Sequence, residues 1–344
     1  MKRLLLILLL LASPLFASDE KVVNVYNWSE YMPEEVLKKF IQETGIKVNY
    51  ATYDSNEVMY TKLKTPQGEA YDLVVPSTYF VNRMRDEDML LRLDKTRLPN
   101  FKNLDATLLN KPYDPNNDYS VPYLWGTTGI GYNSKVIKPG TVRRYKDLWN
   151  PEYKGKVLLL DDVREVFGMG LKVLGYSIND TEEKHIREAY GKLKELMPNV
   201  KVFNAESPKV FFLEEKVTVG LIWNGEIYKA SKENAYIRYI YPAEGASLWM
   251  DNLVIPKRAK NIDNAYVLID FLLRPEIAKL VSEGLGYATP NKAALTLLPK
   301  DFRDIRMIFP IQEDRKNSEF QVELGVEAMS YYEKYWEMLK AGRN

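Results

Sequence analysis

Cysteine is absent from the 344-residue chain, so neither a disulfide framework nor thiolate chemistry can form. A lipid anchor on an N-terminal cysteine is excluded for the same reason. Histidine occurs once, at His185, within a stretch of charged residues. A zinc site there would lack partner ligands, and we expect His185 to be a solvated helix residue. The sequence predicts no metal and no other cofactor.

An excess of one charge is also missing. The chain has 48 basic and 47 acidic residues, which gives a formal net charge of +1. Without a basic surface, binding to nucleic acid is not expected. Beyond the N-terminus, no apolar run is long enough to cross a bilayer. Any preference for a charged ligand must therefore come from a few local side chains.

Residues 1–18 have the features of a signal peptide. Lys2 and Arg3 form a positive start, residues 4–11 are an apolar run too short to span a bilayer, and Ala17 is a small residue at a plausible cleavage site. We expect an exported protein located in the periplasm. Because the chain has no cysteine to carry a lipid anchor, only an outer barrier would keep an exported soluble protein near the cell. An uncleaved N-terminal anchor is the alternative.

The composition that remains is typical of a globular protein. Hydrophobic residues make up 46% and charged residues 28% of the chain, whose length allows two domains with separate cores. Aromatic residues make up 12%, among them 24 tyrosines and 6 tryptophans. Rings with polar tips suit a lined cleft as well as a core.

The mature chain begins with an alternation of strands and helices. Strands are predicted at 22–26, 46–50 and 72–75, and helices at 33–45 and about 54–64. This order is typical of a largely parallel sheet, whose ligands bind beyond the carboxyl ends of the strands. The segments after the first and third strands are therefore candidates for a binding site. They contain Trp28, Ser29, Tyr31, Ser77 and Tyr79.

The alternation restarts in the second half of the chain. A glycine-containing segment at 121–132 is either a strand that crosses between domains or a twisted edge strand. Beyond it, strands are predicted at 157–160 and 217–223, and helices at 163–174, 181–196, 262–273, 275–284 and 323–339. An extended segment at 247–255 is expected to return to the first domain.

That extended segment carries an indole beside a carboxylate. Side chains two apart in a strand share a face, so Trp249 and Asp251 would point the same way. The ring face attracts a positive charge and the carboxylate neutralises it, which suits an organic cation with an apolar stem. A core tryptophan and a turn aspartate are the alternative. Trp223 ends another predicted strand, and it too can be a site residue or a core residue.

Asp162 and Glu165 lie at the predicted start of a helix. Three residues apart, they share a face, so both carboxylates could meet one ammonium group. Alternatively, Asp162 is the N-cap and Glu165 completes a capping box. A third possibility is an exported glycosidase with these residues as acid and base. The spacing argues against it, because the two carboxylates would be too close to flank a scissile bond.

Several runs of sequence carry a resemblance to a known family. They lie at 71–79, 110–112, 114–119, 222–225 and 249–251. Together they resemble the spermidine/putrescine-binding periplasmic proteins of polyamine ABC importers, over nearly all of the mature chain. The resemblance implies an α/β fold of two lobes (the type II periplasmic binding protein fold), with mixed sheets flanked by helices and the chain crossing between lobes. It places lobe 1 at 19–127 plus 252–297 and lobe 2 at 128–251 plus 298–344, with the ligand cleft between them.

The resemblance also implies a function without catalysis. The protein would bind spermidine, and putrescine as well, and deliver it as a monomer to the membrane permease subunits of an ABC importer. The family's binding positions correspond to Trp28, Ser29, Tyr31, Ser77, Tyr79, Asp162, Glu165, Trp223, Trp249, Asp251, Tyr287 and Gln321. Tyr287 and Gln321 are candidates only through this resemblance.

The choice of ligand stays open at this point. Ser29 stands where a spermidine-preferring family member has threonine, although Tyr31 and Gln321 favour spermidine. A binding protein for another organic cation or for a sugar is the alternative, since stacked rings serve sugars too. The three carboxylates of the candidate site favour a cation.

Overall fold

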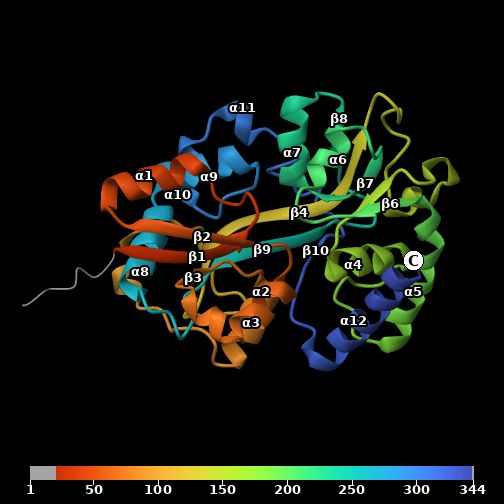
Figure 1. Cartoon of the computed structure of the whole chain (residues 1–344). Coiled ribbons are helices and arrows are strands. Elements are labelled where there is room, and N and C mark those ends of the chain that lie inside the picture. Colours follow the sequence, from red (N-terminus) through yellow and green to blue (C-terminus); the bar gives the residue numbers. More distant parts are fainter. Residues whose placement is uncertain (1–20, 343–344) are drawn as a thin grey trace, which may run out of the picture.

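Two β-sheets flanked by helices make up the fold in the computed structural model, which describes residues 21–342 (Figure 1). The α/β class predicted from the sequence is confirmed. The predicted signal peptide at 1–18 lies outside the described residues. Among residues 21–342, no helix is both long and apolar enough to cross a membrane.

The first sheet has three parallel strands in the order β2-β1-β3. Its elements are β1 (Val22–Trp28), α1 (Glu34–Thr44), β2 (Lys47–Tyr53), α2 (Asn56–Leu63) and β3 (Leu73–Val74). α1 ends at Gly45, whose φ of 70° is left-handed and therefore suits glycine. The predicted β-α-β-α-β opening is confirmed, and it is followed by α3 (Thr78–Asp86), which the sequence did not predict.

The second sheet has seven strands in the order β10-β9-β4-β7-β5-β6, with β8 also paired to β4. They are β4 (Val121–Asn133), β5 (Val157–Leu159), β6 (Val200–Phe203), β7 (Val219–Trp223), β8 (Ile237–Ile240), β9 (Ser247–Leu253) and β10 (Glu319–Phe320). β5 runs parallel to β6 and β7, whereas β4 runs antiparallel to β7, β8 and β9. The sheet is therefore mixed.

Helices cover both sheets. They include α4 (Val163–Leu174), α5 (Glu183–Leu196), α6 (Pro208–Leu213), α7 (Asn224–Glu233), α8 (Ile262–Leu272), α9 (Pro275–Leu285), α10 (Lys292–Leu297), α11 (Lys300–Arg303) and α12 (Gly325–Ala341). The helices predicted in this half are confirmed to within two residues at each end, while α6, α7, α10 and α11 were not predicted. His185 lies in α5 and is partly buried, with its Nδ1 atom 2.9 Å from the Asp180 carboxylate.

The long strand β4 belongs to both halves of the molecule (Figure 1). Its first part pairs with β9, and its last part pairs with β7 and β8. Val121 and Leu124 pack in the hydrophobic core around the first sheet, whereas Ile130 and Tyr132 pack in the core around α4 and α5. The strand therefore crosses between two cores, and the edge-strand alternative is wrong.

β9 runs beside β4 and reaches the first sheet, as predicted. The Val254 amide donates to the Val74 carbonyl at 2.9 Å, and the Asn252 amide donates to the Pro76 carbonyl at 2.9 Å. An isolated antiparallel bridge also joins Asp251 to Ser77. These contacts bring the segment after β3 against the middle of β9, where Trp249 and Asp251 lie.

Candidate functional site

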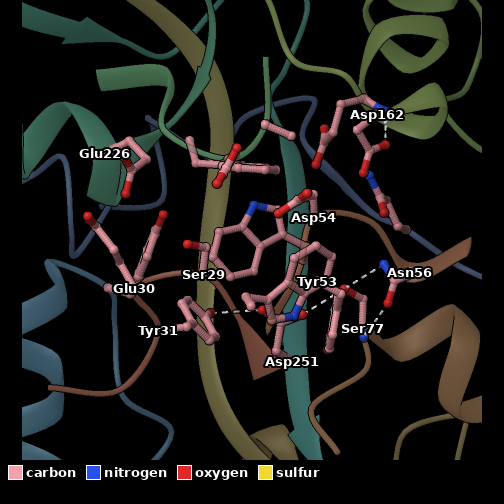
Figure 2. Close-up of a pocket in the computed structure, with 18 of the residues that line it drawn as sticks. Ser29, Glu30, Tyr31, Tyr53, Asp54, Asn56, Ser77, Asp162, Glu226 and Asp251 are labelled. Atoms are coloured by element: carbon pink, nitrogen blue, oxygen red, sulfur yellow. Dashed lines mark hydrogen bonds between the residues drawn. The ribbon is translucent and has the colours of Figure 1, made fainter. Parts of the chain in front are cut away.

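One pocket collects every candidate residue named from the sequence (Figure 2). Its walls include the segments after β1, β2, β3 and β6, the starts of α4 and α7, the end of β7, and β9. The predicted residues that line it are Trp28, Ser29, Tyr31, Ser77, Tyr79, Asp162, Glu165, Trp223, Trp249, Asp251, Tyr287 and Gln321. Residues up to 293 positions apart in the chain thus meet around one space.

Asp251 is buried in the pocket with two hydroxyl donors. The Ser77 hydroxyl donates to Oδ1 at 2.6 Å and the Tyr31 hydroxyl donates to Oδ2 at 2.8 Å (Figure 2). Burial raises the pKa of Asp251 to about 7, although these two hydrogen bonds oppose the shift. The carboxylate is therefore fixed in position while its charge is incompletely compensated.

Trp249 is at once a core residue and a wall of the pocket. Its side chain is buried, and its ring meets Tyr287 edge-on with 5.1 Å between centroids. Tyr287 in turn meets Tyr31 at 5.6 Å. Among residues 21–342, the buried Trp249 Nε1 atom has no hydrogen-bond partner. The ring is therefore a core residue that also lines the pocket, and its contact with a ligand stays a prediction.

The other two tryptophans also line the pocket. The Trp28 indole donates from Nε1 to the Val75 carbonyl at 2.9 Å, and its ring packs on Tyr53 with 4.7 Å between centroids. Trp223 is partly buried and packs against the core of the first half. Both rings are anchored by protein contacts and still present a face to the pocket.

Asp162 caps α4, as one alternative predicted. Its Oδ1 atom accepts a hydrogen bond from the Glu165 amide at 3.0 Å. Glu165 does not complete a capping box; its side chain lines the pocket, where Oε2 is buried without a hydrogen-bond partner in the described part of the chain. Burial, and then the Asp162 carboxylate, raise the pKa of Glu165 to about 8. Burial also raises the pKa of Asp162.

Gln321 and Tyr79 are held by residues from distant elements. The Gln321 side-chain amide donates from Nε2 to the Ser247 hydroxyl at 3.1 Å, and the Gln321 backbone carbonyl accepts from the Thr78 hydroxyl at 3.1 Å. The Asn56 side chain donates to the Tyr79 hydroxyl at 3.0 Å. Arg164 lies over the Tyr79 ring, 5.0 Å from its centroid. These contacts fix the position of both side chains.

Eight further residues line the pocket and were not identified as site residues from the sequence. They are Glu30, Tyr53, Asp54, Asn56, Ala205, Glu206, Glu226 and Lys229. Glu30 lies inside the segment after β1 that the sequence did single out. Glu226 and Lys229 lie on α7, a helix that was not predicted from the sequence, and their acid-base spacing of three residues is typical of one helix face.

The fold and the pocket together indicate the class of protein. Two cores joined by a continuous strand, with a buried cleft lined by rings and carboxylates, are typical of bacterial solute-binding proteins. The family model for bacterial extracellular solute-binding proteins matches residues 35–304. The chain also shares 52% identity with the spermidine/putrescine-binding periplasmic protein of Escherichia coli, over 95% of this chain and 94% of that protein.

The particular family follows from the relatives. Identity to the spermidine/putrescine-binding periplasmic protein 1 of Haemophilus influenzae is 43%, over 95% of this chain and 91% of that protein. A solved structure of a putative spermidine/putrescine ABC transporter from Listeria monocytogenes matches with a TM-score of 0.89 and 39% identity, over 94% of this chain and 100% of that one. The chain belongs to the family of spermidine/putrescine-binding periplasmic proteins, a non-enzymatic family, and the predicted resemblance is confirmed.

Proposed function

We propose that this protein binds spermidine, and putrescine less tightly, in the pocket and delivers it to the permease subunits of an ABC importer in the periplasm. One observation carries the proposal. The buried carboxylates of Asp162, Glu165 and Asp251 line one pocket, and within residues 21–342 none of them has a lysine, arginine or histidine at ion-pair distance. A ligand with positive charges would supply the missing partners.

The chemistry of a polyamine matches this surface. A polyamine is a chain of ammonium groups on methylene spacers, and a buried ammonium group without a partner would cost several kcal/mol. The carboxylates meet the ammonium groups, while the indole and phenol rings pack the methylenes. Each ring beneath a charge would add on the order of 1 kcal/mol. The twelve predicted residues are proposed as the ligand contacts on this basis.

The number of carboxylates without a cationic partner supports spermidine over putrescine. Spermidine has three amino groups and putrescine has two, so the diamine would leave one carboxylate unpaired. That carboxylate would stay buried without a cation, which weakens binding. A sugar is disfavoured because it would pair with none of the three charges. Membership in a non-enzymatic family rules out the glycosidase alternative.

The arrangement of the two halves supports closure around the ligand. We propose lobe 1 at 19–127 plus 252–297 and lobe 2 at 128–251 plus 298–344, with β4 and β9 passing between them. With these bounds, Tyr31 and Ser77 belong to lobe 1, and Asp162 and Glu165 belong to lobe 2. Asp251 is the last residue of lobe 2 before the boundary, and it accepts hydrogen bonds from Tyr31 and Ser77 of lobe 1. A ligand that contacts both groups would favour the closed arrangement. We expect the unit that binds to be a monomer.

Isothermal titration calorimetry with spermidine, putrescine and a maltooligosaccharide tests the function. Spermidine has about 10 non-hydrogen atoms, and roughly −0.8 to −1 kcal/mol per atom corresponds to a micromolar or lower Kd. We expect the order spermidine, putrescine, no binding of the sugar. The protein is first stripped of bound ligand by unfolding and refolding. The proposal would be contradicted if neither amine bound to it, or if the sugar bound tightly.

A further inference from the structure

Two lysines neutralise two carboxylates at one side of the pocket. Lys229 of α7 lines the pocket, its Nζ atom forms an ion pair with Glu226, and it lies 3.5 Å from Glu30 Oε2. Lys209 of α6 lies 2.8 Å from the same Glu30 oxygen. The side chains of Lys209 and Lys229 are only 17% and 16% exposed. These ammonium groups are thus fixed parts of the site rather than mobile surface charges.

The paired and unpaired carboxylates lie in different parts of the site. Figure 2 shows Glu30 and Glu226 together on one side, Asp162 on the opposite side, and Asp251 between them. An elongated ligand that starts at Asp162 and passes Asp251 therefore has Lys229, with its two acidic partners, ahead of it. A further ammonium group on such a ligand would arrive where the protein already holds one.

The charge balance of the pocket gives the same result. The acidic residues that line the pocket are Glu30, Asp54, Asp162, Glu165, Glu206, Glu226 and Asp251. Asp54 and Glu206 are exposed, so solvent and salt screen them. The remaining five carboxylates, less the two lysine charges, leave the site with a net charge of −3 when all are ionised. A triamine with three positive charges would balance it.

We propose that Lys229 is a specificity-determining residue that sets the upper limit on ligand charge and excludes tetraamines such as spermine. This inference rests on the proposed function. A fourth ammonium group would find Glu30 and Glu226 already paired with Lys209 and Lys229, so it would be buried without an anionic partner. Selectivity of this kind comes from a cost imposed on the wrong ligand.

The first test compares spermine with spermidine on the wild-type protein and on Lys229→Met. We expect the wild type to bind spermidine more tightly, and the ratio of the spermine Kd to the spermidine Kd to fall about tenfold or more in the variant. Lys229→Arg keeps the charge and should keep the wild-type ratio. Lys232→Met, an exposed position on the same helix, is the matched control and should also leave the ratio unchanged.

A double variant separates charge from space. Glu226→Gln combined with Lys229→Met removes one charge of each sign, so the site keeps its net −3 and no buried charge loses its partner. We expect its ratio to stay within about threefold of the wild type. The double variant also replaces Lys229→Met if that single variant fails to fold. Comparing it with Glu226→Gln combined with Lys229→Gln then measures how side-chain volume alone changes the ratio.

Three results would overturn the inference: equal affinity of the wild type for spermine and spermidine, an unchanged ratio in Lys229→Met, or a double variant that behaves like the single one. The proposed function fails by a different result, namely no binding of any polyamine by the wild type. Titration of wild type, Lys229→Met, Lys229→Arg, Lys232→Met and the double variant with both amines therefore decides between them.

Discussion

At the scale of single residues, the acidic side chains of the pocket differ in how their charge is balanced. Glu30 is held by Lys209, and this hydrogen bond, with smaller contributions from Lys229, lowers the pKa of Glu30 despite partial burial. Within residues 21–342, the hydrogen-bond donors to Asp251 are two hydroxyl groups, and burial raises the pKa of Asp251. The two carboxylates are thus prepared for different partners, the first for the protein and the second for a ligand.

Asp251→Asn should weaken spermidine binding at least tenfold, which corresponds to about 1.4 kcal/mol. The variant keeps the shape of the side chain and removes the negative charge that an ammonium group needs. Its unliganded fold should be at least as stable as the wild type, because the buried charge is costly. Calorimetric titration and thermal unfolding check both parts. Asp263→Asn, at a side chain that is 90% exposed, is the control and should bind normally.

Spermidine binding should weaken at least tenfold as the pH falls from 8 to 5.5. Burial places the pKa of Asp251 at about 7 and that of Glu165 at about 8, with Asp162, Tyr31 and Tyr287 facing these groups. Both carboxyls are protonated at the lower pH, and only the ionised forms pair with ammonium groups. Binding near pH 7 should therefore release protons, which titration in buffers of different ionisation enthalpy detects.

The unliganded protein should respond to pH in the opposite direction. The folded-state pKa values of Asp251 and Glu165 lie above those of an unfolded chain, so the folded state binds more protons. Their contribution to stability is complete below the unfolded pKa values near 4 and is lost as the pH rises through about 7 to 8. Thermal unfolding without ligand should thus occur at a higher temperature at pH 6 than at pH 8. A flat or inverted profile in this window would show that other groups control the linkage.

At the scale of elements, the sequence predicted the helices whose ends carry a local signal. The end of α1 at Gly45 and the start of α4 at Asp162 follow from a left-handed glycine and a side-chain cap. α3 and α7 start after Ser77 and Trp223, whose side chains form no capping hydrogen bond. Their starts depend on tertiary contacts, which explains why the sequence did not reveal them.

The site residues that were predicted carry local signals in the sequence, and those that were missed do not. Trp249 and Asp251 share one strand face, so spacing alone paired them. Lys229 contacts Glu30 from nearly 200 positions away, on a helix that was not predicted. Nothing local in the chain indicates which lysine will reach which carboxylate. Tyr287 and Gln321 were identified only through the family resemblance for the same reason.

Gly126→Ala tests how β4 positions the site. A Cβ atom at Gly126 would lie 2.5 Å from Trp249 Cζ2 and 2.7 Å from Asn224 Oδ1, so the indole would have to move. We expect a loss of about 1–3 kcal/mol in the free energy of unfolding and weaker spermidine binding. Denaturant unfolding and calorimetry measure the two effects. Gly191→Ala, in α5 with open space around it, should instead be neutral or stabilising.

At the scale of the whole molecule, the proposed ligand contacts come from both halves. Asp162 and Glu165 start α4, next to the core around α4 and α5, whereas Tyr31 and Tyr287 pack in the core around the first sheet. A polyamine that contacts all of them would join the two halves in addition to β4 and β9. Binding would then stabilise the two halves together against unfolding.

Spermidine at about 100 times its Kd should therefore stabilise the protein by about 2.7 kcal/mol. For a chain of this size we expect the unfolding temperature to rise by about 4 °C. Differential scanning calorimetry with and without spermidine measures the rise. Asp251→Asn should show a smaller rise at the same concentration, whereas Asp263→Asn should match the wild type. A rise of equal size in all three proteins would point to non-specific binding of the amine.

The path of β4 through both cores has a mechanical consequence. A loop between lobes would swing freely, but β4 is hydrogen-bonded to β9 along the stretch where it leaves the first core. Opening and closing of the proposed lobes would have to twist the two-stranded ribbon of β4 and β9, and this ribbon would resist the twist. Part of the energy of capture would then be kept as elastic deformation, and it would help the protein to spring open once its cargo is withdrawn.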